Sequence, residues 1–176
     1  MQTIARFEKV SYARYEADFL DCFPRLTCED ARSAYDALRL PRRATAGSAG
    51  YDFFAPVAFT LSSGEGIKIP TGIRACIAEG WVLTLYPRSG LGFRFRLQLD
   101  NTVGVIDSDY YGSDNEGHIF ARLTCDARNG KSVSVPAGTG FMQGIFLPFG
   151  LCEGDDATQV RNGGFGSTTG AAEGRA

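Results

Sequence analysis

The chain has 176 residues, of which 44% are hydrophobic and 22% charged, the composition of one ordinary globular domain with a sizeable core. A formal net charge of −2 gives no electrostatic reason to expect nucleic acid or a membrane surface as a partner. We expect no signal peptide, and every apolar run is far shorter than a membrane span. Five scattered cysteines and one histidine argue against a zinc site or a disulfide framework and favour the reducing cytoplasm.

The segment from about 11 to 40 predicts two short helices. Ser11 can cap a helix whose apolar residues recur at three-to-four spacing up to Pro24, and Thr27 starts a second helix that Pro41 follows. This insert could pack against a neighbouring subunit, dock another protein, or cover the rest of its own domain. We favour the last of these.

From Ala44 onward, short β segments alternate with turns rich in Gly, Pro, Asn and Asp. The expected strands are 51–57, 66–70, 72–77, 81–86, 94–99, 102–106, 118–125, 132–135 and 141–147. Regular strand–turn spacing without long helices predicts a mainly β fold, an antiparallel sandwich or jelly-roll-like barrel. We expect residues 1–152 to form a single domain and 153–176, rich in glycine and small polar residues, to form a flexible C-terminal arm.

Five glycine-bearing stretches carry the polar residues suited to chemistry. They are Ala44–Asp52, Pro87–Gly90, Asn101–Gly112, Gly138–Gln143 and Arg161–Thr168. None contains a Walker lysine motif or a dinucleotide fingerprint, and each taken singly could be a tight turn. Pro87–Gly90 nevertheless offers a guanidinium, a hydroxyl and backbone N–H groups to an anion. The last stretch adds a cation, an aromatic ring and glycine hinges, which suit a lid over such a ligand.

In this order the five stretches resemble the five motifs of the trimeric dUTP pyrophosphatases (dUTPases), over roughly residues 44–170. The resemblance implies a dUTPase-like β-clip fold and hydrolysis of dUTP to dUMP and pyrophosphate, which limits uracil incorporation into DNA and supplies dUMP for dTMP synthesis. It also implies a homotrimer with shared active sites. Three features depart from the family pattern: the insert at 11–40, a fourth motif that keeps only its ends, and a fifth motif one residue short between Arg161 and Phe165.

The third motif is the expected site of base selection. If 101–106 forms a β-hairpin, its backbone can present a fixed donor and acceptor pattern that admits uracil and rejects cytosine. The resemblance assigns uracil and deoxyribose to Asn101, Gly104, Ile106, Tyr110 and Phe165, with the Tyr110 ring beneath the sugar and Phe165 stacked over the base.

The resemblance makes Asp107 the general base that activates water for attack on the α-phosphorus, whereas Asp109 suits an exposed turn. A triphosphate carries close to four negative charges, so a Mg²⁺ ion bound by phosphates and waters is the natural supplement, with Asp52 near it through water. The residues expected on phosphates are Arg88, Ser89, Gly90, Gln143, Arg161, Gly166 and Ser167.

Two rival functions stay open at this point. A dCTP deaminase shares the fold and the Arg-Ser cradle, but it needs a glutamate base, and the corresponding arm here carries Asp107. A non-catalytic dUTP-sensing regulatory protein could keep the fold, but it would have no need of that base.

Overall fold

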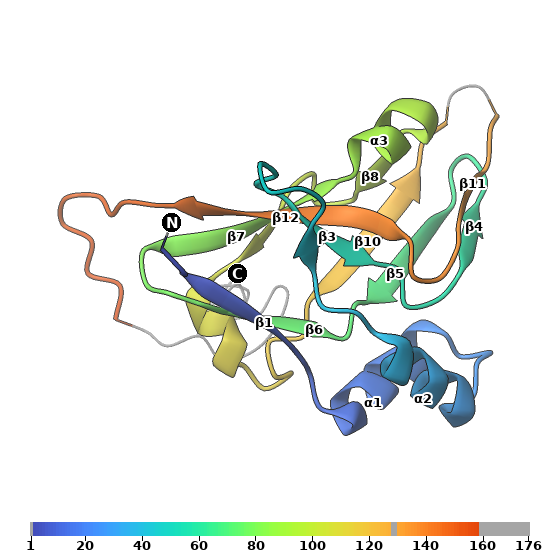
Figure 1. Ribbon diagram of the computed structural model, residues 1–176, viewed down its shortest axis with the longest axis horizontal. Helices are drawn as coiled ribbons and strands as arrows, with labels where there is room; N and C mark the ends of the chain where they lie inside the picture. Colours follow the sequence, from blue (N-terminus) through green and yellow to red (C-terminus); the bar gives the residue numbers. More distant parts are fainter. Residues whose placement is uncertain (1, 128–129, 159–176) are drawn as a thin grey trace, which may run out of the picture.

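The computed structural model describes residues 2–127 and 130–158 (Figure 1). Its helices are α1 (Tyr12–Cys22), α2 (Cys28–Ala37), α3 (Ser89–Phe95) and the 3-10 helix η1 (Ser108–Gly112). Its strands are β1 (Ala5–Lys9), β2 (Arg42–Arg43), β3 (Tyr51–Phe54), β4 (Phe59–Leu61), β5 (Gly66–Pro70), β6 (Ile73–Ile77), β7 (Trp81–Pro87), β8 (Leu97–Leu99), β9 (Gly104–Ile106), β10 (Phe120–Cys125), β11 (Val133–Val135) and β12 (Gly140–Pro148).

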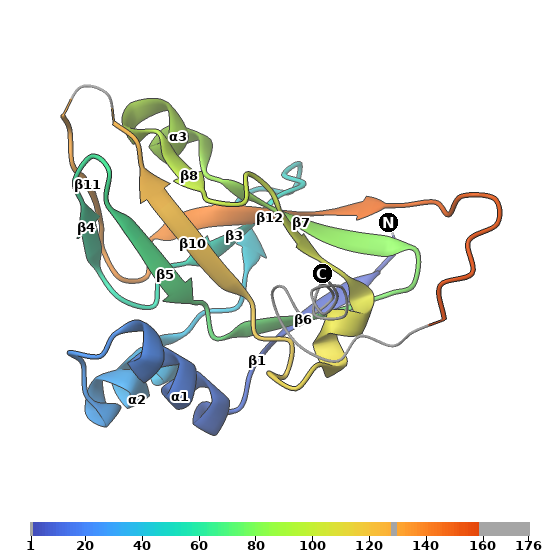
Figure 2. The ribbon, with the colours of Figure 1, turned by 180° about the vertical axis from the view of Figure 1, so that it is seen from behind.

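Within the described residues these strands form four antiparallel groups, ordered β1-β6, β5-β10-β8, β11-β4 and β2-β3-β12-β7-β9. The last group positions most of the candidate site, since β12 pairs with β3 on one side and β7 on the other. Figures 1 and 2 show the groups wrapped around a shared interior, with α3 at one end and α1 and α2 at the other. The prediction of a mainly β, antiparallel fold is confirmed.

The core follows from the alternation of side chains along these strands. On β7, Leu83 and Leu85 are 0% and 1% exposed, and they meet buried Phe53, Phe141 and Met142 from the neighbouring strands. Each large apolar side chain removed from water contributes about 1.5–3 kcal/mol. This interior therefore fixes the ladder register on which the site depends.

The two predicted helices are confirmed. The Ser11 hydroxyl accepts from the Arg14 N–H at the start of α1, and Thr27 forms a capping box with Asp30 at the start of α2. The buried faces of the helices, including Tyr15, Phe19 and Ala31, form a small core of their own. Helix α1 lies against β5, so the hairpin of helices covers the β domain of its own chain.

Two expectations about strands need correction. The predicted strand 94–99 is shortened to β8, because residues 89–95 form helix α3, which ends at Arg96 with a left-handed φ of 48°. Strands β1, β2 and β4 were not predicted. The predicted hairpin at 101–106 is instead a corner between sheets: β8 pairs with β10, whereas β9 pairs with β7.

Candidate active site

Three of the predicted residues meet on the sheet β3-β12-β7. Gln143 on β12 lies opposite Asp52 on β3 and opposite Tyr86 on β7. Arg88 follows β7 directly, and its Nε lies 3.4 Å from Asp52 Oδ1. The ladders thus place a cation, a carboxylate and an amide from the first, second and fourth motifs side by side.

Two glycines make this close approach possible. A Cβ atom at position 50 would lie 2.7 Å from Gln143 Oε1, and one at position 140 would lie 2.7 Å from Arg88 Nη1. Any larger residue at either position would displace the polar side chain beside it. The glycines of the first and fourth motifs therefore make room for Gln143 and Arg88.

A hollow of about 420 Å³ lies over this cluster. It is lined by Tyr86, Pro87, Arg88, Ser89, Gly92, Phe93, Gln143 and Ile145. Ser89 and Gly90 are exposed in the first turn of α3, where backbone N–H groups have no acceptor within the helix. The hollow thus offers a guanidinium, a hydroxyl, an amide and N–H groups, which are donors suited to phosphate oxygens.

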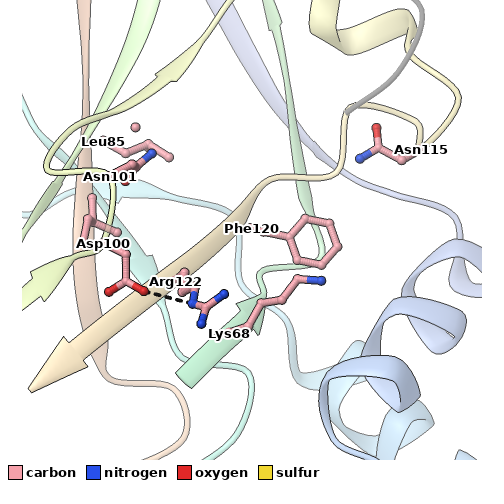
Figure 3. Close-up of a pocket in the computed structure, with 9 residues that line it drawn as sticks. Lys68, Leu85, Asp100, Asn101, Asn115, Phe120 and Arg122 are labelled. Carbon is pink, nitrogen blue, oxygen red and sulfur yellow. Dashed lines mark ion pairs between the residues drawn. The ribbon is translucent and has the colours of Figure 1, made fainter. Parts of the chain in front are cut away.

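The third motif lines a second pocket, of about 520 Å³ (Figure 3). Figure 3 shows Leu85 and Asn101 on one side and Phe120 and Lys68 on another, with Asp100 paired to Arg122. Sequence reasoning missed Lys68, Phe120 and Arg122, which come from β5 and β10 and carry no motif signal. It also missed Asn115, in the segment after η1.

The corner at Asn101 is tightly bonded. The N–H of Thr102 donates to the Leu99 carbonyl at 2.9 Å, and Thr102 adopts a left-handed φ of 65°. A Cβ atom at position 104 would lie 3.0 Å from the Leu85 side chain, so glycine lets β9 approach β7 here. Both Asn101 and Gly104 line the pocket, whereas the Ile106 side chain is buried in the core.

Asp107 and Tyr110 follow β9. Asp107 is half-buried at the start of η1, and Asp109 is exposed. Tyr110 is only 4% exposed; its hydroxyl donates to the His118 carbonyl at 2.8 Å and accepts from Asn115 Nδ2 at 2.7 Å. The Tyr110 ring is therefore held rigidly, and its contact with a sugar stays a prediction.

Asp107 and Arg88 lie at opposite ends of β7. Ile106, the residue before Asp107, pairs with Leu83, whereas Arg88 follows Leu83 by five residues. Five strand residues span about 17 Å. Within one chain, Asp107 and Arg88 are therefore far apart along β7.

No cluster of three or more His, Cys, Asp or Glu side chains that could hold a metal ion occurs among residues 2–127 and 130–158. In that same part of the chain, no helix is long and apolar enough to cross a membrane. The predicted residues Arg161, Phe165, Gly166 and Ser167 lie outside the described residues.

Comparison with known proteins agrees with this geometry. The dUTPase family model matches residues 36–169. The deoxyuridine 5'-triphosphate nucleotidohydrolase of Lactococcus lactis is 42% identical over 136 residues, which cover 74% of this chain and 88% of the relative. The deoxyuridine 5'-triphosphate nucleotidohydrolase of Psychromonas ingrahamii is 38% identical over 135 residues, which cover 72% of this chain and 85% of the relative. The structure of a dUTPase from Streptococcus mutans aligns with a TM-score of 0.61 at 36% identity, covering 84% of this chain and 98% of that one.

Fold and site together define a β domain with a hollow that carries hydrogen-bond donors beside Arg88 and a separate pocket at the third motif. The matches over most of the chain are more specific: this protein belongs to the dUTPase family.

Proposed function

We propose that the protein is a dUTP diphosphatase that hydrolyses dUTP to dUMP and pyrophosphate. The observation that carries the proposal is the register that aligns Asp52, Arg88 and Gln143 on one sheet, in a chain whose relatives are named for this activity. Incubating the protein with dUTP, dCTP, dTTP and UTP, with and without Mg²⁺, and measuring pyrophosphate tests it. We expect pyrophosphate to be released from dUTP alone. Release of ammonia from dCTP would indicate a deaminase, and binding of dUTP without turnover would indicate a sensor.

Uracil binds in the pocket at Asn101 and Gly104, where the fixed backbone corner provides hydrogen-bond partners. Cytosine presents the opposite hydrogen-bond sense at N3 and N4, so its binding would leave polar groups unpaired. That penalty is far larger than the loss of one methylene contact, so it supports strong discrimination.

Asp107 accepts a proton from a water molecule, which attacks the α-phosphorus and displaces pyrophosphate. Arg88, Ser89, Gly90 and Gln143 hold the phosphate oxygens in line with that attack. A carboxylate is a weak base, so alignment and charge neutralisation supply much of the acceleration. Arg161, Phe165, Gly166 and Ser167 are proposed to close over the nucleotide.

Mg²⁺ is the proposed cofactor. The described residues offer single carboxylates such as Asp52 and no protein-built cage, which fits an ion bound mainly by phosphates and waters. When bound, the ion neutralises phosphate charge. A dUTPase from phage phi11 of S. aureus, 19% identical to this chain, has a structure in which a structural Mg(II) ion is coordinated.

We further propose a homotrimer with shared sites, in the cytoplasm. The separation of Asp107 from Arg88 along β7 supports sharing, because a second chain must then supply the phosphate cradle. The outer face of the same sheet carries apolar side chains that a neighbouring chain could cover: Val105, which is 54% exposed, and the part-exposed Val82 and Ile145 on β7 and β12. A protein partner at the helical insert also stays a prediction; exposed residues such as Glu29, Arg32 and Asp36 would face it.

Mixing two inactive variants tests the sharing. Asp107→Asn and Arg88→Ala chains, unfolded together and refolded at equal amounts, should recover about a quarter of the wild-type activity, because random assembly pairs the two intact residues in that share of sites. Each variant refolded alone is the control. A mixture no more active than its components would mean that both residues serve the site from one chain.

A further inference from the structure

Helix α1 of the helical insert contacts the segment that follows Asp107. This segment, residues 108–119, begins with η1 and runs to β10. It contains Tyr110 and Asn115, and it leads into Phe120 on the pocket wall. The insert, which departs from the family pattern, therefore lies next to the segment that holds Tyr110, the residue expected beneath the sugar.

The first contact is a buried pair. His118 is 0% exposed, and its Nε2 accepts from the Gly72 N–H at 2.8 Å. In the neutral ring the proton must then be on Nδ1, which donates to Asp18 Oδ2 at 2.6 Å. Arg14 also donates to Asp18 at 2.9 Å from its Nε. The Gly72 N–H thus sets the tautomer of His118, and one carboxylate of α1 holds the orientation of its ring.

His118 in turn contacts Tyr110 and Phe120, of which Phe120 lines the pocket. Its carbonyl accepts the Tyr110 hydroxyl at 2.8 Å, and its ring centroid lies 4.5 Å from that of Phe120. Asn115, which also lines the pocket, donates to the same tyrosine oxygen. A displacement of His118 would therefore move the Tyr110 hydroxyl and the Phe120 ring together.

Two outer contacts join the insert to the β domain, one at the segment 108–119 and one at β5. Glu116 accepts from the Ser11 N–H at 2.7 Å and from its hydroxyl at 2.6 Å, and it holds a left-handed φ of 60°. A residue other than glycine keeps such a conformation only where its surroundings impose it. At the other end of α1, Asp21 lies 3.6 Å from Lys68 Nζ, which sits 4.8 Å from the centre of the Phe120 ring.

We propose that Asp18 of the helical insert is a positioning residue for the nucleotide pocket: through His118 it holds Tyr110 and Phe120 where the sugar is discriminated. This inference rests on the proposed dUTP hydrolysis and deepens it. The helical insert then serves selectivity between deoxyribo- and ribonucleotides in addition to covering the β domain.

The test compares three variants. Asp18→Ala removes the carboxylate, whereas Asp18→Asn keeps an amide oxygen that can still accept from His118 Nδ1. Asp36→Ala makes the same change at an exposed position on α2 and is the control. For each variant, kcat and KM are measured with dUTP and with UTP, and the melting temperature is recorded. We expect Asp18→Ala to reduce the ratio of kcat/KM for dUTP to that for UTP by about tenfold, a loss typical of small displacements in a site. Asp18→Asn should recover most of this ratio, and Asp36→Ala should keep all of it.

A wild-type protein that does not hydrolyse dUTP would refute the proposed function. An active wild type whose Asp18→Ala variant keeps the full ratio would refute the positioning role alone, even if its melting temperature falls. If Asp18→Ala does not fold, Asp18→Ser, which keeps a polar group on α1 but is too short to bond His118 Nδ1, provides the measurement. A reduced ratio in Asp18→Ser supports the proposal, and an unchanged ratio overturns it.

Discussion

Asp107 and Asp109 are separated by one residue and differ in how far they are buried. Asp107 is half-buried where η1 begins, and Asp109 is exposed. Asp107→Asn should keep nucleotide binding but lower kcat by about 10²–10⁴-fold, because the amide cannot accept the proton of the attacking water. Steady-state kinetics with a binding isotherm for a non-hydrolysable analogue measures both. Asp109→Asn is the matched control, and equal losses in the two variants would remove Asp107 as the base.

Gly140 offers a second test at the level of one residue. A methyl group there would overlap Arg88 Nη1, so Gly140→Ala should push the guanidinium out of the phosphate cradle. We expect KM for dUTP to rise about tenfold, the loss of roughly one charge-assisted hydrogen bond. Gly150→Ala, at a position with no neighbour within 4 Å of the added carbon, should leave KM unchanged. An unaltered KM in Gly140→Ala would mean that Arg88 does not grip the phosphates.

The C-terminal arm is a separate element in the proposed function. A chain shortened to residues 1–159 should keep its melting temperature and lose about tenfold or more in kcat, because the lid and its phosphate donors are gone. Kinetics and thermal denaturation of the shortened and full-length proteins provide the comparison. Unchanged kinetics would contradict the proposal that the arm closes over the nucleotide. The division into a domain of 1–152 and an arm of 153–176 stays a prediction.

Local signals were enough to predict several elements. Ser11 and Thr27 cap helices with their own side chains, and β5 and β7 are short segments rich in apolar residues and bounded by turn residues. Helix α3 escaped prediction because Gly90 and Gly92 are poor helix formers, and because Phe93, which continues an alternating pattern, is 89% exposed.

The missed parts depend on contacts between distant residues. Strand β1 exists because it pairs with β6, more than sixty residues later in the chain. Lys68 and Phe120 line the pocket only because β5 and β10 pair in one register, which no single segment encodes. The cluster of Asp52, Arg88 and Gln143 could be predicted from the motifs, whereas its neighbours could not.

For the whole molecule, the single histidine predicts how stability depends on pH. Burial lowers the pKa of His118 below its ordinary value, although the hydrogen bond to Asp18 acts in the opposite direction. The unfolded chain therefore binds this proton more readily, and the free energy of unfolding falls as pH drops through about 6.5, by at most about 1.4 kcal/mol per pH unit. Melting temperatures between pH 8 and pH 5 measure the slope. His118→Asn should flatten it, and a slope that persists in this variant would assign the pH dependence elsewhere.

The length of strand β7 sets a distance within the proposed site. The stretch from Leu83, which pairs with Ile106, to Arg88 sets the interval between the proposed base, Asp107, and the proposed phosphate cradle. Adding one residue would turn every later side chain to the other face, and adding two would move Arg88 by about 7 Å. In the proposed homotrimer, either change would move Arg88 relative to the Asp107 of the neighbouring chain. The length of β7 is therefore expected to be constrained by that assembly as well as by the fold of one chain.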